Sequence, residues 1–178
     1  MSAATDPIIS ALEAASRSAA VSAYVAQVLE RVERGLVAAP DAPMAWESVP
    51  LSGFNRPLPE AIRSCWVFVI RAGAETGAER HSNSHQRSLS LKGRGEFQLR
   101  QGDRWESYPL VSDPGAPLGE RWVSIPQGTW HRLLVGGGNW GMLSFHTVAA
   151  QELVEERPIR PESLDGGPTE QHRYQSEG

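Results

Sequence analysis

Apolar side chains follow a helical period through the first forty residues. They recur at steps of three and four positions, as Val21, Tyr24, Val25, Val28, Leu29, Val32 and Leu36. This spacing places them on one face of an α-helix, and that face needs a partner surface to be buried. Pro40 ends the pattern, because proline lacks the amide hydrogen that a helix interior needs. We therefore predict that residues 1–44 form a helical segment that packs on the rest of the chain or on a second copy of it.

From residue 45 to residue 154 the pattern changes to that of short β-strands. Residues 65–70 form an apolar run, and residues 87–91 alternate between polar and apolar side chains until Gly93. Further short runs at 96–99, 122–125, 131–135 and 140–148 are set apart by glycine and proline. Many short strands with turn residues between them favour a β-sandwich or barrel over an α/β sheet. Residues 155–178 are polar and have little to bury, so we predict a loosely ordered tail there.

Composition and charge exclude several classes of protein. The 178 residues are enough for one domain with its own core. The 17 basic and 21 acidic residues give a net charge of -4, which argues against a nucleic-acid partner because phosphate binding needs a basic face. No apolar run approaches the ~20 residues of a membrane span, and the N-terminal residues lack the features of a secretory signal. We expect a cytoplasmic protein without a membrane partner, and its single cysteine, Cys65, cannot form a disulfide within the chain.

Potential metal ligands and polar side chains gather in the predicted β region. Glu79, His81, His85 and Gln86 lie within eight residues, and His131 and His146 follow later. Because side chains alternate along a strand, Glu79 and His81 should share one face. The same alternation should put Gln86, Ser88 and Ser90 on one face of the next strand. Imidazole and carboxylate groups are the usual ligands of catalytic zinc, iron and manganese.

Two motifs in this region resemble those of the cupin superfamily, the RmlC-like jelly-roll barrels. Residues 125–131, Ile-Pro-Gln-Gly-Thr-Trp-His, match the second cupin motif, Pro-x-Gly-x-x-His. Residues 91–97, Leu-Lys-Gly-Arg-Gly-Glu-Phe, match the end of the first motif. Counting back seven positions from Gly93 puts Gln86 at the glutamate position of that motif. His81 and Glu79 then take the places of its second and first histidines. The resemblance implies a mainly β fold, a double-stranded β-helix over residues 45–154, preceded by the helical segment.

The resemblance also implies a metal site, for which three solutions stay open. His81 and His131 occupy ligand positions unchanged, whereas Glu79 and Gln86 replace the usual residues. Glu79, His81 and His131 would form a set of two histidines and one carboxylate, which suits non-haem iron. His81, His85 and His131 would form a three-histidine set, and the third solution is that the metal was lost. The expected cofactor is a divalent first-row metal, iron first, with manganese, nickel or zinc as alternatives.

Dioxygenase-like oxidation of a small polar molecule is the function that the resemblance implies first. Isomerase or lyase chemistry on the same metal site is an alternative. Replacement of the motif glutamate by Gln86 favours another alternative, a non-catalytic cupin that binds a small ligand. A structural dimer with a vestigial pocket is the last alternative. Four side chains are candidates for substrate contact, namely Gln86, Ser88, Ser90 and His146. Cupins commonly pair, so we also expect a homodimer.

Overall fold

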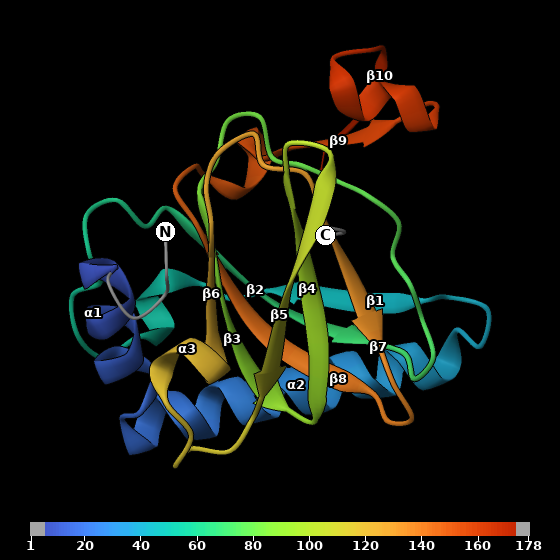
Figure 1. The fold of residues 1–178 in the computed structure, drawn as a ribbon. Helices are drawn as coiled ribbons and strands as arrows, with labels where there is room; N and C mark the ends of the chain where they lie inside the picture. The colour runs from blue at the N-terminus through green and yellow to red at the C-terminus, as the bar shows by residue number, and fades with distance from the viewer. Residues whose placement is uncertain (1–5, 174–178) are drawn as a thin grey trace.

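The computed structural model describes residues 6–173, which fold into a β-barrel with helices along one side (Figure 1). The helices are α1 (Pro7–Ser16), α2 (Ala19–Ala38) and α3 (Leu118–Arg121), with short 3-10 turns η2 (Leu51–Gly53), η3 (Ala150–Glu152) and η4 (Pro161–Asp165). The barrel strands are β1 (Met44–Ser48), β2 (Ser64–Ile70), β3 (Gln86–Lys92), β4 (Arg94–Gln101), β5 (Arg104–Val111), β6 (Trp122–Ile125), β7 (His131–Val135) and β8 (Trp140–His146). Strands β9 (Val154–Pro158) and β10 (Thr169–Arg173) follow them.

The strand order is that of a jelly roll. One sheet has the order β1-β2-β8-β3-β6, and the other has the order β5-β4-β7. Isolated bridges from Glu75 to Leu134 and from Glu79 to His131 add residues 75–79 to the second sheet, beside β7. Both sheets thus interleave early and late strands of the chain, which is the arrangement of a double-stranded β-helix. The predicted fold class, a mainly β jelly-roll barrel behind a helical segment, is confirmed.

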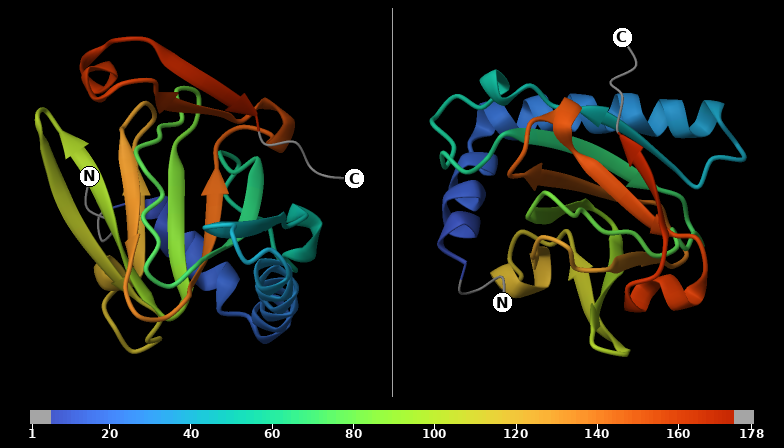
Figure 2. Two further views of the ribbon diagram at one scale, coloured as in Figure 1. Left: turned by 90° about the vertical axis from the view of Figure 1, so that its right-hand side faces the viewer. Right: turned by 90° about the horizontal axis from the view of Figure 1, so that it is seen from above.

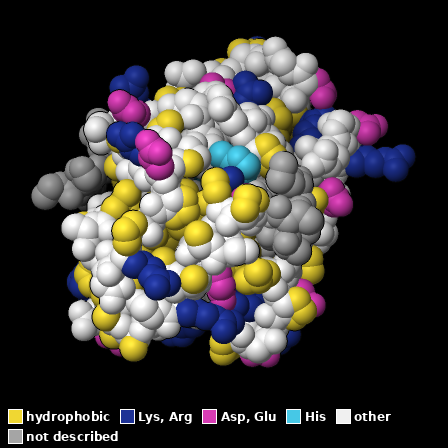
Figure 3. Space-filling model, turned by 90° about the vertical axis from the view of Figure 1, so that its left-hand side faces the viewer, with side chains coloured by type: hydrophobic (Ala, Val, Ile, Leu, Met, Phe, Trp, Pro, Cys, Tyr) yellow, Lys and Arg dark blue, Asp and Glu magenta, His cyan; other side chains and the backbone are white. Residues whose placement is uncertain are grey.

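Strand alternation separates two apolar cores. Residues 64–70 are buried on both faces. Cys65, Val67 and Val69 face the helices, while Trp66, Phe68 and Ile70 face the barrel interior. Helix α2 lies along the outer face of the five-stranded sheet (Figure 2, right) and buries the predicted stripe as Val21, Val25, Val28, Val32 and Leu36. Apolar side chains remain visible between charged ones on the side of the molecule where α1 lies (Figure 3).

The N-terminal segment differs from the prediction in being two helices. Ser18 caps α2 by accepting a hydrogen bond from the Val21 amide, and a serine at this place begins a new helix. Buried ion pairs then fasten this part of the chain to β3 and to α3. Asp6 pairs with Arg87 of β3 (2.6 Å), and Glu13 pairs with Arg121 of α3 (2.6 Å). In residues 6–173 no helix has both the length and the apolar character needed to cross a membrane.

The C-terminal segment also differs from the predicted loosely ordered tail. Strands β9 and β10 form an antiparallel hairpin, and we call residues 154–173 the C-terminal arm. The arm lies over one end of the barrel (Figures 1 and 2). Glu155 and Glu156 are buried there despite their charge, because Arg157 and Arg80 pair with them. Ion pairs and hydrogen bonds to distant residues thus order a segment that has little apolar surface. Residues 174–178 of the predicted tail lie outside the described residues.

Candidate metal centre

Three predicted ligands converge at one end of the barrel interior. The ligand atoms of Glu79, His81 and His131 all lie within 4.8 Å of one another, and all three side chains are buried. Glu79 and His81 point the same way because they are two positions apart on one extended segment. His131 opens β7 and exchanges backbone hydrogen bonds with Glu79, both of 2.8 Å. The register of two neighbouring strands therefore assembles the group.

Backbone carbonyls orient both imidazole rings. The Nδ1 atom of His81 lies 3.1 Å from the carbonyl oxygen of Val154, and the Nδ1 atom of His131 lies 3.1 Å from that of Thr129. A carbonyl oxygen only accepts, so each Nδ1 carries the hydrogen. The lone pair of each ring then sits on Nε2, which is the form that binds metals.

Polar atoms without hydrogen-bond partners support a bound cation. Among the described residues, the buried Nε2 of His131 and Oε1 of Gln86 have no hydrogen-bond donor. The His131 Nε2 atom stands 3.4 Å from Oε1 of Glu79. Adjacent donors that are about 2.1 Å from one ion stand roughly 3.0–3.4 Å apart, so this separation suits shared coordination. The residues present therefore fit a divalent metal.

Burial and neighbouring charges set the protonation of the group. Burial, followed by the neighbouring His131, lowers the pKa of His81 to about 4, so this ring is neutral at pH 7. Burial raises the pKa of Glu79, but its contact with His131 and the charge of Arg157 outweigh burial, and the net shift is downward. A carboxylate beside a neutral imidazole is the protonation state that a metal requires.

A small cavity adjoins these residues inside the barrel. Its volume is about 20 Å³, which is close to the space that one water molecule needs. Its walls are Met44, Phe68, Ile70, Glu79, His81, Gln86, Phe97, Leu133, Met142, Ser144 and His146. The polar side chains come from the ligand segment, β3 and β8, and apolar side chains close the remainder. The cavity therefore has room for one ion, or for one small chemical group of a ligand next to the three side chains.

The predicted substrate contacts share the interior face of β3, but they do different things. Gln86 Nε2 donates to Ser88 Oγ (3.0 Å), and Ser88 Oγ lies 2.7 Å from Ser144 Oγ. Ser90 lies farther along the strand and accepts a hydrogen bond from the indole of Trp140 (2.9 Å). Of the three predicted residues on β3, only Gln86 lines the cavity.

His146 is a buried neighbour of the candidate metal ligands. Its ring meets the His81 ring edge to face, with 5.0 Å between the ring centroids. Burial lowers the pKa of His146 well below its usual value, so it is neutral. It lines the cavity, and its contact with a substrate stays a prediction. Ser144, two positions earlier on β8, was not predicted, although strand alternation in residues 140–148 links it to His146.

The structure does not bring His85 to the other predicted ligands. Its Nε2 atom lies 2.9 Å from Ser124 Oγ, and Ser124 in turn donates to Asp6. His85 precedes Gln86 on the chain, so strand alternation turns it to the opposite face of the sheet. The geometry therefore supports the set of two histidines and one carboxylate and not the three-histidine set.

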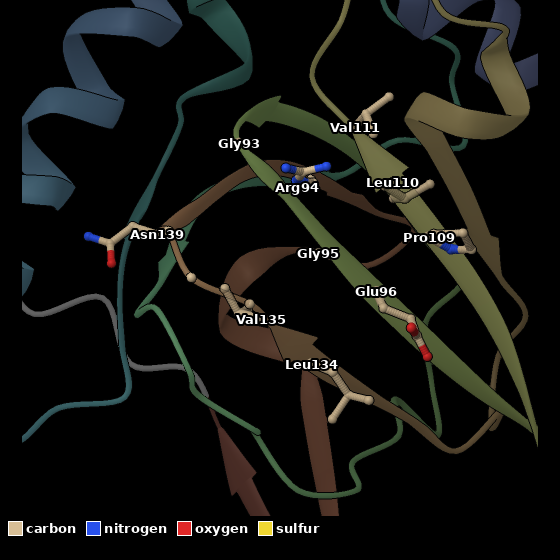
Figure 4. A pocket seen from close by; sticks show the side chains of 13 residues that line it. Gly93, Arg94, Gly95, Glu96, Pro109, Leu110, Val111, Leu134, Val135 and Asn139 are labelled. Atoms are coloured by element: carbon tan, nitrogen blue, oxygen red, sulfur yellow. The ribbon is translucent and has the colours of Figure 1, made fainter.

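A larger hollow of about 760 Å³ lies elsewhere, between the ends of β4, β5 and β7 (Figure 4). It shares no lining residue with the metal-site cavity. Its charged side chains are Arg94 and Glu96, and the turn at residues 136–138 contributes three glycines. It offers no imidazole, so the candidate chemistry stays with Glu79, His81 and His131.

Comparisons with known proteins find similarity in structure. No family model and no curated protein sequence matches the chain. An oxalate oxidase in complex with glycolate matches with 12% identity over 60% of this chain, at a TM-score of 0.46. The capsular polysaccharide assembling protein CapF of Staphylococcus aureus matches with 17% identity over 70% of this chain, at a TM-score of 0.46. A protein from Bacillus halodurans matches with 24% identity over 48% of this chain, at a TM-score of 0.41.

These matches are partial. The chain covers 52% of the oxalate oxidase, 31% of CapF and 62% of the Bacillus halodurans protein. Because the TM-scores lie below 0.5, the fold assignment rests on the strand order and on the positions of the two motifs. The second motif leads into β7 with His131 in place, and the first places His81 beside it. The chain therefore has a jelly-roll barrel fold with a buried group of two histidines and a glutamate, and its two motifs resemble those of cupins.

Proposed function

We propose that the protein is a metal-dependent cupin enzyme that acts on a small polar molecule, with dioxygenase-like oxidation as its reaction. One observation carries the proposal, namely that Glu79, His81 and His131 place three metal-ligating atoms within 4.8 Å in a buried site. Two imidazoles and one carboxylate are typical of non-haem Fe(II) oxygenases, because they leave coordination positions open. Iron is therefore the first expected metal, with manganese, nickel and zinc as alternatives.

The surrounding side chains have roles that follow from their contacts. When bound, the metal supplies Lewis-acid activation of a chelating substrate and electron transfer to or from it. The Gln86 amide has an acceptor oxygen available in the buried site, and His146 lines the same cavity. Both are placed to orient a small oxygenated substrate. Ser88 holds the Gln86 amide by accepting its hydrogen bond, and Ser90 supports the packing of Trp140. Apolar walls such as Phe97 and Met142 exclude water from the site.

A non-catalytic cupin that binds a small ligand is the second candidate. The neutral amide of Gln86 and a cavity of only about 20 Å³ favour it, since both limit what can reach and react at the site. Isomerase or lyase chemistry would use the same ligands without oxygen consumption. The homodimer and the cytoplasmic location stay predictions of the sequence.

Metal content is the measurement that tests the proposal. Untagged protein, reconstituted anaerobically with Fe(II) and desalted, should hold about one equivalent of metal by elemental mass spectrometry. His131→Ala should lose it, whereas His172→Ala, a change at an exposed histidine of β10, should retain it. No retained metal in the wild type would refute the metal-dependent enzyme. Retained metal with no oxygen consumption across a panel of small hydroxylated and carboxylated compounds would favour the ligand-binding candidate.

A further inference from the structure

The C-terminal arm contacts two of the three proposed metal ligands from outside the cavity. The carbonyl oxygen of Val154 lies 3.1 Å from Nδ1 of His81. The guanidinium of Arg157 donates to Oε2 of Glu79 (3.0 Å), on the opposite side of the carboxylate from His131. Both contacts come from the single strand β9. One short segment thus sets the orientation of an imidazole and of a carboxylate.

The arm is held in register with the ligand segment. Arg80, which stands between Glu79 and His81, exchanges backbone hydrogen bonds of 2.9 and 3.0 Å with Glu156. The Arg80 side chain also pairs with the Glu156 carboxylate at 2.7 Å. Asn83 then acts as a two-sided clamp, because its Nδ2 donates to the Glu152 carbonyl (2.7 Å) and its Oδ1 accepts from the Val154 amide (3.2 Å). These contacts place Val154 and Arg157 directly against the ligands.

Contacts of this kind alter metal affinity. Partners that hold the outer atoms of metal ligands typically change affinity by about 10–100-fold when they are removed. They act by fixing the ring tautomer and the carboxylate orientation before the metal arrives. Arg157 also holds one oxygen of Glu79, which leaves Oε1 as the atom facing His131. That arrangement favours binding through a single carboxylate oxygen and keeps coordination positions open.

We propose that strand β9 is a positioning element of the metal site, so that docking of the C-terminal arm and metal binding are coupled. The proposal rests on the metal site proposed above. Val154 and Arg157 act as positioning residues, through His81 and Glu79. By thermodynamic linkage, an arm that improves metal binding is itself stabilised by the metal to the same degree.

The first test uses the wild-type protein and hydrogen exchange. Mn(II) should slow amide exchange in residues 154–157 beyond any change in β5, which β4 separates from the strand of His131. Metal binding that leaves the exchange of β9 unchanged would overturn the coupling. This measurement needs no variant and therefore does not depend on a substituted chain folding.

The second test loosens the arm without touching a ligand side chain. Asn83→Ala removes the clamp, and its matched control is Gln127→Ala, which removes an amide contact to the Ser82 carbonyl in the neighbouring turn. The Kd for Mn(II) should rise by about 10–100-fold in Asn83→Ala. It should stay within about twofold in the control. Equal Kd values for the two variants would contradict the proposal.

Arg157→Gln tests whether Arg157 sets the orientation of the Glu79 carboxylate, and the readout is the coordination geometry of the bound metal. Affinity alone is a poor readout here, because removing a positive charge by itself favours a cation. With Glu79 Oε2 released, the visible spectrum of the Co(II) protein should change, since coordination number and geometry determine it. Arg100→Gln, which removes an ion pair to Asp165 and none to a ligand, should leave that spectrum unchanged. An unchanged Arg157→Gln spectrum would remove Arg157 from the proposal.

The outcomes separate this inference from the proposed function. If the wild type binds no metal, both fall together. If it binds one equivalent that His131→Ala loses, while Asn83→Ala and the exchange of β9 behave as in the controls, only the coupling falls. A metal-dependent arm with no oxygen chemistry would keep the coupling and favour the ligand-binding candidate.

Discussion

Gln86 and His146 are register partners across β3 and β8, and both side chains line the cavity beside the proposed metal ligands. Gln86 stands where the cupin motif has a glutamate, while Glu79 stands where the motif has a histidine. The candidate site therefore has one carboxylate, that of Glu79, which lies on the same segment as His81. The amide of Gln86 remains beside it as a neutral polar group whose Oε1 accepts no hydrogen bond from the described residues.

Gln86→Glu should make the protein more dependent on metal. Without metal, a second carboxylate near Glu79 is repelled and desolvated, so the Tm in EDTA should fall. With metal, the added anionic donor should tighten binding by about tenfold, since affinity rises with ligand charge. Saturating Mn(II) should therefore raise the Tm more in the variant than in the wild type. Thermal unfolding with EDTA and with Mn(II) checks both expectations.

Gln127→Glu is the matched control for this change, because Gln127 lies in an exposed turn. Its Tm should respond to Mn(II) as the wild type does. A Gln86→Glu protein that loses the same stability with and without metal would show that position 86 does not face the ion.

His85→Ala and His81→Ala should separate the two ligand sets that the sequence left open. His81 belongs to the convergent group, whereas His85 contacts Ser124 on the other face of the sheet. Loss of His81 should abolish stoichiometric metal binding, and loss of His85 should change the Kd by less than about threefold. Equilibrium dialysis with Mn(II) measures both. Loss of metal from His85→Ala would instead support His81, His85 and His131 as the ligand set.

Asp6→Asn should lower the free energy of unfolding at neutral pH. It should also make that free energy depend less on pH in the acidic range. Burial raises the pKa of Asp6, but hydrogen bonds from Arg87 and Ser124 and the charge of Arg87 lower it more, so that the net shift is downward. A carboxylate whose folded pKa is depressed contributes stability above its unfolded pKa. That contribution is lost as the pH falls through the folded pKa, here below about pH 4. Removing one partner of a buried pair should cost about 3–5 kcal/mol at pH 7.

Urea unfolding between pH 2.5 and pH 7 checks this expectation for Asp6→Asn. Glu47→Gln breaks the exposed pair with Arg31 and should cost less than about 1 kcal/mol at pH 7. Equal losses in the two variants would mean that the contact between α1 and β3 contributes no more than a surface ion pair does.

Local patterns account for the parts of the structure that the sequence predicted. The alternation in residues 87–91 places serines inside and leucines outside, because side-chain direction along a strand depends only on position. The positions of His81 and His131 were predictable from motif spacing, because each motif spans a turn and the strand next to it. The division of the N-terminal segment at Ser18 was missed, because a capping serine within an alanine-rich stretch is a weak signal.

Long-range contacts account for the parts that the sequence did not predict. Arg157 reaches Glu79 across a separation of 78 residues, and no periodicity in the polar C-terminal segment indicates this. His85 stayed a candidate ligand until its contact with Ser124 was seen, although alternation back from Gln86 turns it to the opposite face of the sheet. The buried charges of the C-terminal arm depend on pairing that only the folded barrel provides.

Gly95→Ala should disturb the barrel interior and, through it, the metal site. A Cβ at Gly95 would overlap the Trp140 ring, which is fully buried and donates to Ser90. Trp140 packs on Phe97 with 5.5 Å between ring centroids, and Phe97 packs on His131 at 6.2 Å. Overpacking should cost about 1–3 kcal/mol, measured by urea unfolding.

The matched control is Gly119→Ala, because a Cβ there meets open space in α3 and alanine is the better helix former. Its stability should stay equal to that of the wild type or rise slightly. Movement of Trp140 should also displace Phe97 and His131, so Gly95→Ala should bind Mn(II) more weakly than Gly119→Ala does. A destabilised Gly95→Ala protein with unchanged metal affinity would show that the strain relaxes elsewhere, and that Phe97 does not hold the His131 ring.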